Sequence, residues 1–526
     1  MTGQVETAVF PVLIGGEWRP AQVKGTLQAT NPATGEALEG LYPVSGQEDV
    51  LAAIAAASGV TPGTPEHIAA FLQRYAELIE GSGAELSALA ALETGLPEKG
   101  RLLETELPRT TRQLRLAADT ALSRSWTRPT IDTEAGLRSV LQPLGKPVVV
   151  FGPNNFPFAF NAVSGGDFAA ALAVGNPVIA KAHPGHLGTT RALARLAFQA
   201  VQESGLHPAS LQLLYHLPPD LGFLLVGDAR VGAVAFTGSR GGGLALKRAA
   251  DAAGVPIYLE LGSVNPVLLL PGAVAERPAE LAKELFNANT LGAGQFCTNP
   301  GLVIAVEGPG QAAFVQALTG AYQSAGSGVL LTEGAAPHIG AGLKTLTGAG
   351  ATLVAGGQAD TPGFRFQPSL LTADAKTFLA HPDALQTEVF GPVCLLVTVQ
   401  EDELDRVLAP LEASLTASIY SSATGSDDAL YGRAEPVLRQ LCGRLINDRM
   451  PTGVAVSSAQ MHGGPYPAGG HPGFTSVGIP AALTRFAALR GYDHVRDGRL
   501  PAELQDANPT GCWRLVDGRW TQEALA

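Results

Sequence analysis

Three side chains of this 526-residue sequence stand in settings that suit covalent chemistry. Cys297 lies in the run Gly292-Ala-Gly-Gln-Phe-Cys-Thr-Asn-Pro300, where tight turns would expose its sulfur as a nucleophile that a base or a lowered pKa must activate. Glu260 lies in an apolar run, where desolvation is expected to raise its pKa and suit it to general-base work. Asn155 follows another apolar run, and its amide could donate to a developing oxyanion.

Structural interpretations of the same residues remain open. A lone cysteine is usually a small buried hydrophobe, glutamates mostly face water, and asparagine is a common turn residue. The segment Phe236-Thr-Gly-Ser-Arg-Gly-Gly-Gly243 is a fourth candidate, because glycines let a backbone approach a phosphate and a helix N-terminus offers free N–H groups. It is not a G-x-G-x-x-G motif, so by itself it is weak evidence.

Alternating strands and helices are expected to position these segments. Apolar runs predict strands at 146–151, 176–181, 211–215, 231–237 and 256–260, with a second set at 302–306, 352–355 and 393–398, and Ala-rich stretches predict helices at 167–174 and 189–204. Such alternation is typical of βαβ units and a parallel sheet, in which ligands bind at the carboxyl ends of the strands.

Composition limits the classes of function. The formal net charge is −12 and no block of Lys and Arg occurs, which argues against nucleic acid or a membrane surface as a partner. The length predicts two or three domains. The four cysteines, Cys297, Cys394, Cys442 and Cys512, form no C-x-x-C pair, so neither a disulfide framework nor a metal site is expected. No signal peptide and no membrane-spanning run is visible, and we expect a cytoplasmic protein.

In combination, the motifs resemble the aldehyde dehydrogenase family from about residue 31 to about residue 490. They are Asn-Phe-Pro at Asn155, Phe-Thr-Gly-Ser at Phe236, Glu-Leu-Gly at Glu260, Gly-Gln-x-Cys at Cys297 and Glu-Val-Phe-Gly-Pro at Glu388, in the family's order. The resemblance implies an α/β fold with a Rossmann-type dinucleotide domain (1–126 and 146–262), an α/β catalytic domain (263–475) and a small oligomerisation arm (127–145 and 476–526). A homodimer or homotetramer is expected.

The resemblance also implies roles for the reactive residues. Cys297 matches the nucleophile that attacks the aldehyde carbon, giving a thiohemiacetal and then a thioester. Asn155, with the backbone N–H of Cys297, matches the oxyanion hole, and Glu260 matches the base that activates water for hydrolysis. His462 lies in a segment typical of a subfamily and could assist the thiol, although a lone histidine is more often a structural hydrogen-bonding group.

Cofactor residues follow from the same resemblance: Lys181 for the adenosine ribose, Gly238, Ser239 and Gly243 for the pyrophosphate, and Glu388 with Phe390 for the nicotinamide ribose. Lys181 as a solvated strand end and Glu388 as a helix cap are the structural alternatives. NAD-preferring relatives often carry Glu three positions after the lysine, where this sequence has Pro184. With His183, Lys181 and Arg240 as nearby positive groups, we expect a preference for NADP, with NAD as a second cofactor.

The substrate prediction rests on three further sequence segments. The segments 162–171, 262–266 and 451–467 resemble α-ketoglutaric semialdehyde (2,5-dioxovalerate) dehydrogenases and the similar NADP-linked fatty aldehyde dehydrogenases, which are the alternative. A substrate carboxylate needs a cation. Arg109, Arg112 and Gln113 are spaced to share one helical face, either as an anion-binding face or as a solvated surface. A cysteine hydrolase or acyltransferase and a non-catalytic binding protein are the other classes considered.

Overall fold

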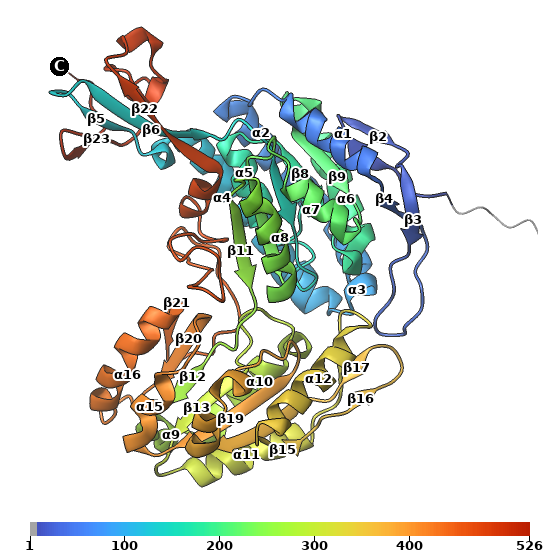
Figure 1. Ribbon diagram of the computed structural model, residues 1–526, viewed down its shortest axis with the longest axis vertical. Helices are drawn as coiled ribbons and strands as arrows, with labels where there is room; N and C mark the ends of the chain where they lie inside the picture. The colour runs from blue at the N-terminus through green and yellow to red at the C-terminus, as the bar shows by residue number, and fades with distance from the viewer. Residues whose placement is uncertain (1–7, 526) are drawn as a thin grey trace, which may run out of the picture.

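The upper lobe of the computed structural model, which describes residues 8–525, is built on a seven-stranded sheet (Figure 1). Its strands run in the order β11 (Ile257–Leu261), β10 (Ala233–Gly238), β7 (Val148–Phe151), β8 (Val178–Lys181), β9 (Leu211–Leu214), β1 (Val12–Ile14) and β2 (Glu17–Arg19). The first five are parallel, and β1 and β2 extend the sheet in antiparallel fashion. Every residue of β7 and β9 is buried, as continuous apolar runs in a parallel sheet require.

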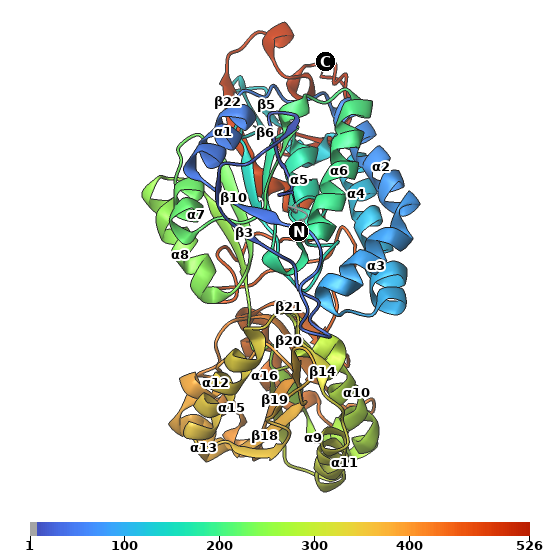
Figure 2. The ribbon, with the colours of Figure 1, turned by 90° about the vertical axis from the view of Figure 1, so that its right-hand side faces the viewer.

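Helices cover both faces of this sheet (Figure 2). One face carries α1 (Gln47–Ser58), α7 (Pro219–Val226) and α8 (Arg240–Ala252), and the other carries α2 (Pro65–Gly81), α3 (Gly83–Thr94), α4 (Leu107–Ser123), α5 (Gly166–Val174) and α6 (Leu187–Ser204). A π-helical segment, Glu98–Glu106, leads directly into α4. The doubly covered sheet explains why its strands carry few polar residues.

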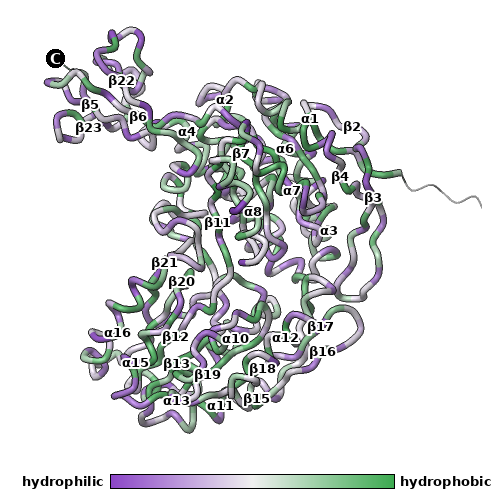
Figure 3. The backbone as a smooth tube through the Cα atoms, in the orientation of Figure 1, coloured by the Kyte–Doolittle hydropathy of each residue, from purple (hydrophilic) through white to green (hydrophobic). Residues whose placement is uncertain are grey.

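The lower lobe repeats the architecture with a second seven-stranded sheet. Its order is β15 (Thr352–Ala355), β18 (Ser369–Asp374), β19 (Val393–Val399), β13 (Leu302–Val306), β12 (Val267–Leu269), β20 (Ser414–Tyr420) and β21 (Cys442–Asn447), parallel except for β15. Its helices are α9 (Pro271–Glu276), α10 (Pro278–Thr290), α11 (Gln311–Gln323), α12 (Ala335–Gly348), α13 (Ala375–Ala380), α14 (Pro382–Leu385), α15 (Leu404–Leu408) and α16 (Asp428–Leu441). The hydrophobic colour around β12 and β13 in Figure 3 marks its core.

An arm projects from the upper lobe and holds the C-terminus (Figure 1). Its sheet has the order β22 (Ala487–Asp493), β6 (Leu137–Pro143), β5 (Thr130–Asp132), β23 (Arg514–Val516) and β24 (Arg519–Thr521). Two smaller sheets pair β3 (Val23–Leu27) with β4 (Tyr42–Ser45), and β14 (Gly328–Val329) and β16 (Ala359–Asp360) with β17 (Arg365–Phe366). The α/β fold predicted from the sequence is confirmed, and all of the predicted strands and helices form. Between residues 8 and 525, no helix is both long and apolar enough to cross a bilayer.

Asn176 ties the upper lobe to the arm, and this contact gives a stability prediction. Its side-chain oxygen accepts a hydrogen bond from the backbone N–H of Leu144 (2.9 Å), and its amide donates to the carbonyl of Phe486 (2.8 Å). Asn176→Ala leaves both backbone groups, one half-buried and one buried, unpaired, which should cost about 2 kcal/mol and lower the thermal midpoint by about 2 °C. Asn287→Ala, on the exposed side of α10, is the matched control and should shift the midpoint little; equal shifts would contradict the assignment.

Candidate functional site

A cavity of about 460 Å³ lies where the carboxyl ends of the upper sheet face the lower lobe. Nine of the residues singled out from the sequence line it: Asn155, Lys181, His183, Gly238, Ser239, Glu260, Cys297, Glu388 and Phe390. Segments almost 240 positions apart therefore meet at one site. The place of this site, outside the ends of parallel strands, is where open α/β sheets bind ligands.

The Cys297 loop is held by unusual backbone geometry. Gly292, Ala293 and Gly294 all have positive φ (57°, 54° and 69°), so the chain makes a left-handed turn just before the thiol. A Cβ on Gly294 would lie 2.2 Å from the carbonyl oxygen of Gly391, so only glycine fits there. The buried Asn265, also at positive φ, donates its amide to the carbonyls of Cys297 (2.9 Å) and Asn299 (3.0 Å). Asparagine tolerates this conformation, and its amide fixes the loop on both sides of the thiol.

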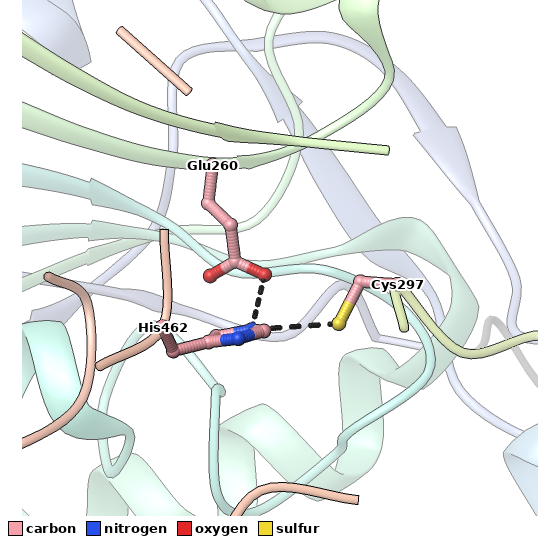
Figure 4. A group of neighbouring side chains, drawn as sticks. All are labelled: Glu260, Cys297 and His462. Atoms are coloured by element: carbon pink, nitrogen blue, oxygen red, sulfur yellow. Dashed lines mark hydrogen bonds and ion pairs between the residues drawn. The ribbon is translucent and has the colours of Figure 1, made fainter. Parts of the chain in front are cut away.

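Two side chains, Glu260 and His462, meet beside the Cys297 thiol (Figure 4). The Nε2 atom of His462 lies 2.7 Å from Oε1 of Glu260 and 3.5 Å from Sγ of Cys297. The second carboxylate oxygen of Glu260 accepts a hydrogen bond from the hydroxyl of Ser476 at 2.7 Å. Glu260 and His462 are 4% and 1% exposed, whereas Cys297 is partly open to the cavity. The imidazole therefore bridges a buried carboxylate and an accessible sulfur.

The electrostatics of this group correct one expectation from the sequence. Burial raises the pKa of Glu260, but the charge of His462 and the hydrogen bonds from His462, Ser476 and Cys297 outweigh burial and hold this pKa below its ordinary value. A raised pKa for Glu260 was therefore wrong, because the apolar strand hid polar partners from other segments. Burial and then the neighbouring carboxylate of Glu260 raise the pKa of the Cys297 thiol well above its usual range. The resting site pairs a carboxylate with a neutral thiol.

Asn155 is fixed by a second buried carboxylate. The Nδ2 group of Asn155 donates to the carbonyl of Gln295 (3.0 Å), which leaves its other N–H for the cavity. Glu106 is fully buried and accepts hydrogen bonds from the backbone N–H groups of Phe158 (2.8 Å) and Ala159 (2.9 Å). Arg101 pairs with Glu106 and also donates to the carbonyl of Asn155. The turn that carries Asn155 is therefore anchored to the π-helical segment before α4.

The glycine-rich segment opens α8 beside the cavity. The hydroxyl of Ser239 caps this helix by accepting a hydrogen bond from the N–H of Gly242 (3.3 Å). Gly243 does not line the cavity: a Cβ there would lie 2.6 Å from a methyl group of Leu261, so its glycine lets the helix approach the sheet. Arg240 also points elsewhere, into an ion pair with Glu412 (2.9 Å). Of the predicted phosphate-binding residues, Gly238 and Ser239 therefore line the site.

Basic side chains lie close together at the end of β8. In the described part of the chain, no carboxylate is among the neighbours that shift the pKa of Lys181 or of His183. Burial lowers the pKa of Lys181 to about 8. Burial, followed by the charges of His186 and Lys181, lowers the pKa of His183 well below its usual range. His216, which the sequence analysis missed, follows β9 and faces the same group, since burial and the charge of Lys181 lower its pKa. A single histidine after a strand gives no local signal, so only the packing of β8 beside β9 identifies it.

Glu388 is half-buried and its carboxyl group lies against a glycine. Burial raises the pKa of Glu388 to about 7, while Arg240 acts in the opposite direction. A Cβ on Gly262 would lie 2.0 Å from Oε2 of Glu388, so this glycine is what admits the carboxylate. Phe390, two residues later, lines the same cavity and is 36% exposed.

The three residues of the predicted anion-binding face on α4 have different surroundings in the structure. The Arg109 guanidinium lies over the rings of Phe160 (5.0 Å) and Phe156 (5.3 Å), and its Nε and Nη2 atoms are buried without a hydrogen-bond partner in residues 8–525. Burial lowers the pKa of Arg109, whereas Cys297 is among the nearby groups that raise it. Arg112 instead is exposed, and Gln113 is buried with its amide donating to the carbonyl of Ala159 (3.1 Å). A shared face for all three was wrong, because helical spacing does not say which residues pack inward.

Arg444 on β21 is a further basic group that the sequence analysis missed. Its Nη2 donates to the carbonyls of Pro451 and Gly453 (both 3.0 Å). Burial lowers the pKa of Arg444, and Cys297 is among the neighbouring groups that act in the opposite direction. Ser476 and Asn265 were missed as well. Each acts through contacts with segments more than 30 positions away, for which the local sequence carries no signal.

Comparisons with known proteins show the family and the fold. Residues 18–431 match the model of the family described as "Aldehyde dehydrogenase family". The chain is 40% identical over 525 residues to alpha-ketoglutaric semialdehyde dehydrogenase 2 of Azospirillum brasilense, covering 97% of this chain and 98% of that protein. It is 36% identical over 479 residues to alpha-ketoglutaric semialdehyde dehydrogenase of Acinetobacter baylyi, covering 87% and 88%. An NAD+ complex of aldehyde dehydrogenase from Bacillus cereus shares the fold, with a TM-score of 0.79 at 21% identity over 92% of this chain and 96% of that one.

The contact between Glu260 and Cys297 leads to a prediction. It distinguishes an effect of the Glu260 charge on the thiol pKa from proton transfer between the two groups. Glu260→Gln removes the negative charge that helps raise the pKa of the thiol, so alkylation of Cys297 by iodoacetamide at pH 7.5 should become about tenfold faster. Mass spectrometry of the Cys297 peptide measures this rate. Ser476→Ala keeps the charge and serves as the control. Slower alkylation in the Gln variant would mean instead that Glu260 activates the thiol as a base.

Proposed function

The chain belongs to the aldehyde dehydrogenase family, and we propose that it oxidises α-ketoglutaric semialdehyde (2,5-dioxopentanoate) to 2-oxoglutarate, with NADP as its preferred cofactor. The observation that carries the substrate is the Arg109 guanidinium, buried near the thiol with two nitrogen atoms unpaired. A carboxylate at the far end of a short substrate would pair with it in a charge-assisted contact. The two relatives of that name support the same choice.

Catalysis begins at Cys297. The thiol gives its proton to water in the cavity as the sulfur attacks the aldehyde carbon. The Nε2–H group of His462, 3.5 Å from the sulfur, stabilises the negative charge that develops there. The carbon–oxygen double bond opens, and the oxygen gains negative charge in the thiohemiacetal. The free N–H of the Asn155 amide and the backbone N–H of Cys297 stabilise this charge. The phenyl rings of Phe156, Phe160 and Phe296 form a buried cluster beside the reacting group and keep water away.

The residues around the rest of the cavity fit a nicotinamide dinucleotide. Gly238 and Ser239, at the N-terminus of α8, suit a pyrophosphate, because no side chain fills the space beside Gly241 and the first N–H groups of a helix attract anions. Lys181 suits the adenosine ribose, and Glu388 with Phe390 suits the nicotinamide ribose. When bound, this cofactor supplies the ring that accepts a hydride from the substrate carbon, which leaves a thioester on Cys297.

Hydrolysis of the thioester is assigned to Glu260. Its carboxylate is ionised because its pKa lies below the ordinary value, so it can accept a proton from water that attacks the thioester carbon. The bond between carbon and sulfur then breaks, the carboxylic acid leaves, and the thiol recovers its proton. Ser476 and His462 hold the two carboxylate oxygens and so fix the direction of the base.

The proposal includes a preference for NADP over NAD. Pro184 stands where a carboxylate would repel a 2′-phosphate, and Lys181, His183 and His216 supply positive or proton-binding groups there. Arg240, also considered from the sequence, is already paired with Glu412. We therefore assign the phosphate to the first three groups, with NAD as a second cofactor.

The division of the chain is also part of this proposal. We assign 1–126 and 146–262 to the cofactor domain and 263–475 to the catalytic domain. The arm, 127–145 and 476–526, is assigned to contacts in a cytoplasmic homodimer or homotetramer. The exposed side chains of Leu489 (66%) and Trp520 (59%) on the arm support this role, because large apolar groups in water are typical of interaction surfaces.

The alternative substrate is a long-chain aliphatic aldehyde. The cluster of Phe156, Phe160 and Phe296 favours it, since aromatic walls suit an alkyl chain. Comparison of kcat/KM for 2,5-dioxopentanoate, succinic semialdehyde, glutaraldehyde and decanal decides between the two. A much higher kcat/KM for decanal than for the keto acid would overturn the proposed substrate.

Arg109→Met sharpens this test. Loss of one charge-assisted contact is worth about 1.5–3 kcal/mol, so kcat/KM for 2,5-dioxopentanoate should fall about 10- to 100-fold while that for decanal stays nearly constant. Arg112→Met, exposed on the same helix, is the matched control and should change neither value. An equal loss for both aldehydes would show that Arg109 only supports the fold.

Cofactor preference should depend on pH. Because burial places the pKa of Lys181 at about 8, its ammonium group loses its proton as the pH rises through this value, and its attraction for a phosphate is lost. Fluorescence titration should show that NADPH binds more tightly than NADH at pH 6.5. The Kd for NADH divided by the Kd for NADPH should fall about tenfold between pH 6.5 and pH 9. His216→Asn should lower the ratio at pH 6.5. A ratio that favours NADH throughout would rule out this assignment.

A further inference from the structure

The thiol of Cys297 and the two groups beside it also offer a set of metal-binding atoms. Sγ of Cys297, Nε2 of His462 and a carboxylate oxygen of Glu260 all lie within 4.8 Å of one another (Figure 4). Within residues 8–525, no other group of three His, Cys, Asp or Glu side chains meets this spacing. Thiolate, imidazole and carboxylate are the three protein ligands that Zn²⁺ accepts. Sequence spacing gave no metal site, because these ligands come from β11, the Cys297 loop and the segment after β21.

The distances suit a tetrahedral ion. With a Zn–S bond of about 2.3 Å and a Zn–N bond of about 2.0 Å, the edge between sulfur and nitrogen in a tetrahedron is about 3.5 Å. The observed distance from Sγ to Nε2 is 3.5 Å. The distance of 2.7 Å from Nε2 to Oε1 must widen by about 0.6 Å, which rotation of the Glu260 carboxylate can supply.

The surroundings support such a site. Ser476 holds the second oxygen of Glu260, as partners of metal ligands commonly do. The sulfur faces the cavity, which provides an entry path and a fourth position for water. Carboxyl groups and guanidinium groups both lie near the sulfur, Glu260 and Glu388 among the first and Arg109 and Arg444 among the second. The carboxyl groups reduce the repulsion that the arginines exert on a divalent cation.

We propose that Zn²⁺ binds reversibly to Cys297, Glu260 and His462 and inhibits the enzyme. On binding, the thiol and the Nε2–H group of His462 each release a proton to solvent, the thiolate sulfur and Nε2 bond to the ion, and no electron is transferred. A sulfur held by zinc cannot attack an aldehyde, and the general base is occupied as well. The inhibition rests on the proposed function, in which Cys297 is the nucleophile, but the binding does not.

Titration of the full-length protein with Zn²⁺ by calorimetry, and with Co²⁺ by absorption, tests the binding. We expect one ion per chain, with a thiolate-to-cobalt charge-transfer band. Cys297→Ser and His462→Asn should each weaken binding at least tenfold and abolish or alter the band. Cys512→Ser and His338→Asn, on the arm and on α12, are matched controls and should bind as the unaltered chain does. Unchanged affinity in the first two variants, or ions bound only by surface histidines, would overturn the site.

A readout on the unaltered chain guards against variants that fail to fold. Zn²⁺ should protect Cys297 from iodoacetamide, and EDTA should restore both the alkylation and the oxidation of aldehyde. Alkylation that is unaffected by saturating Zn²⁺ would overturn the proposal. If the chain oxidises no aldehyde, the proposed function fails, while the titrations and the protection of Cys297 still decide whether the metal binds.

Discussion

The buried carboxylate of Glu260 is the contact on which the site depends, because it joins three parts of the chain that are far apart in sequence. Glu260 lies next to the last residue of β11. Its carboxylate meets His462 at 2.7 Å and Ser476 at 2.7 Å and raises the pKa of Cys297. A carboxylate in the interior is costly unless hydrogen bonds and an opposite charge compensate it. The segment that carries His462 and Ser476 must therefore return to the upper sheet. The backbone bonds between Leu261 and Ala468 and between Gly470 and Leu259 secure this return.

A second constraint acts on the backbone around the thiol. The left-handed turn at Gly292–Gly294 and the positive φ of Asn265 are conformations that most residues avoid. They persist because the close approach of Gly294 to Gly391 and the amide of Asn265 hold both sides of the loop. The result is a sulfur that is open to the cavity, although it belongs to a tightly packed segment. Strain of this kind is typical of places where a reactive group must be positioned.

Among the described residues, basic side chains without acidic partners lie in two places near the site. Lys181, His183 and His216 lie at one end without an acidic partner in the group, and Arg109 lies near the thiol with two unpaired nitrogen atoms. Burial lowers the pKa of each of these groups, so each gains from an anion that restores its charge. A chain with a net charge of −12 therefore still holds local basic groups beside the site.

Local sequence determined a large part of this protein. Apolar runs and Ala-rich stretches predicted the strands and helices, because strand and helix periodicity depends on neighbouring residues, and motifs identified Cys297, Glu260 and Asn155 as residues of one cavity. The tertiary structure alone decided the electrostatics and the partners. Neither the lowered pKa of Glu260 nor the inward position of Arg109 beside the exposed Arg112 follows from spacing. Burial and hydrogen bonding are set by side chains that arrive from elsewhere in the chain, and the sequence around a residue does not say which of them will be its neighbours.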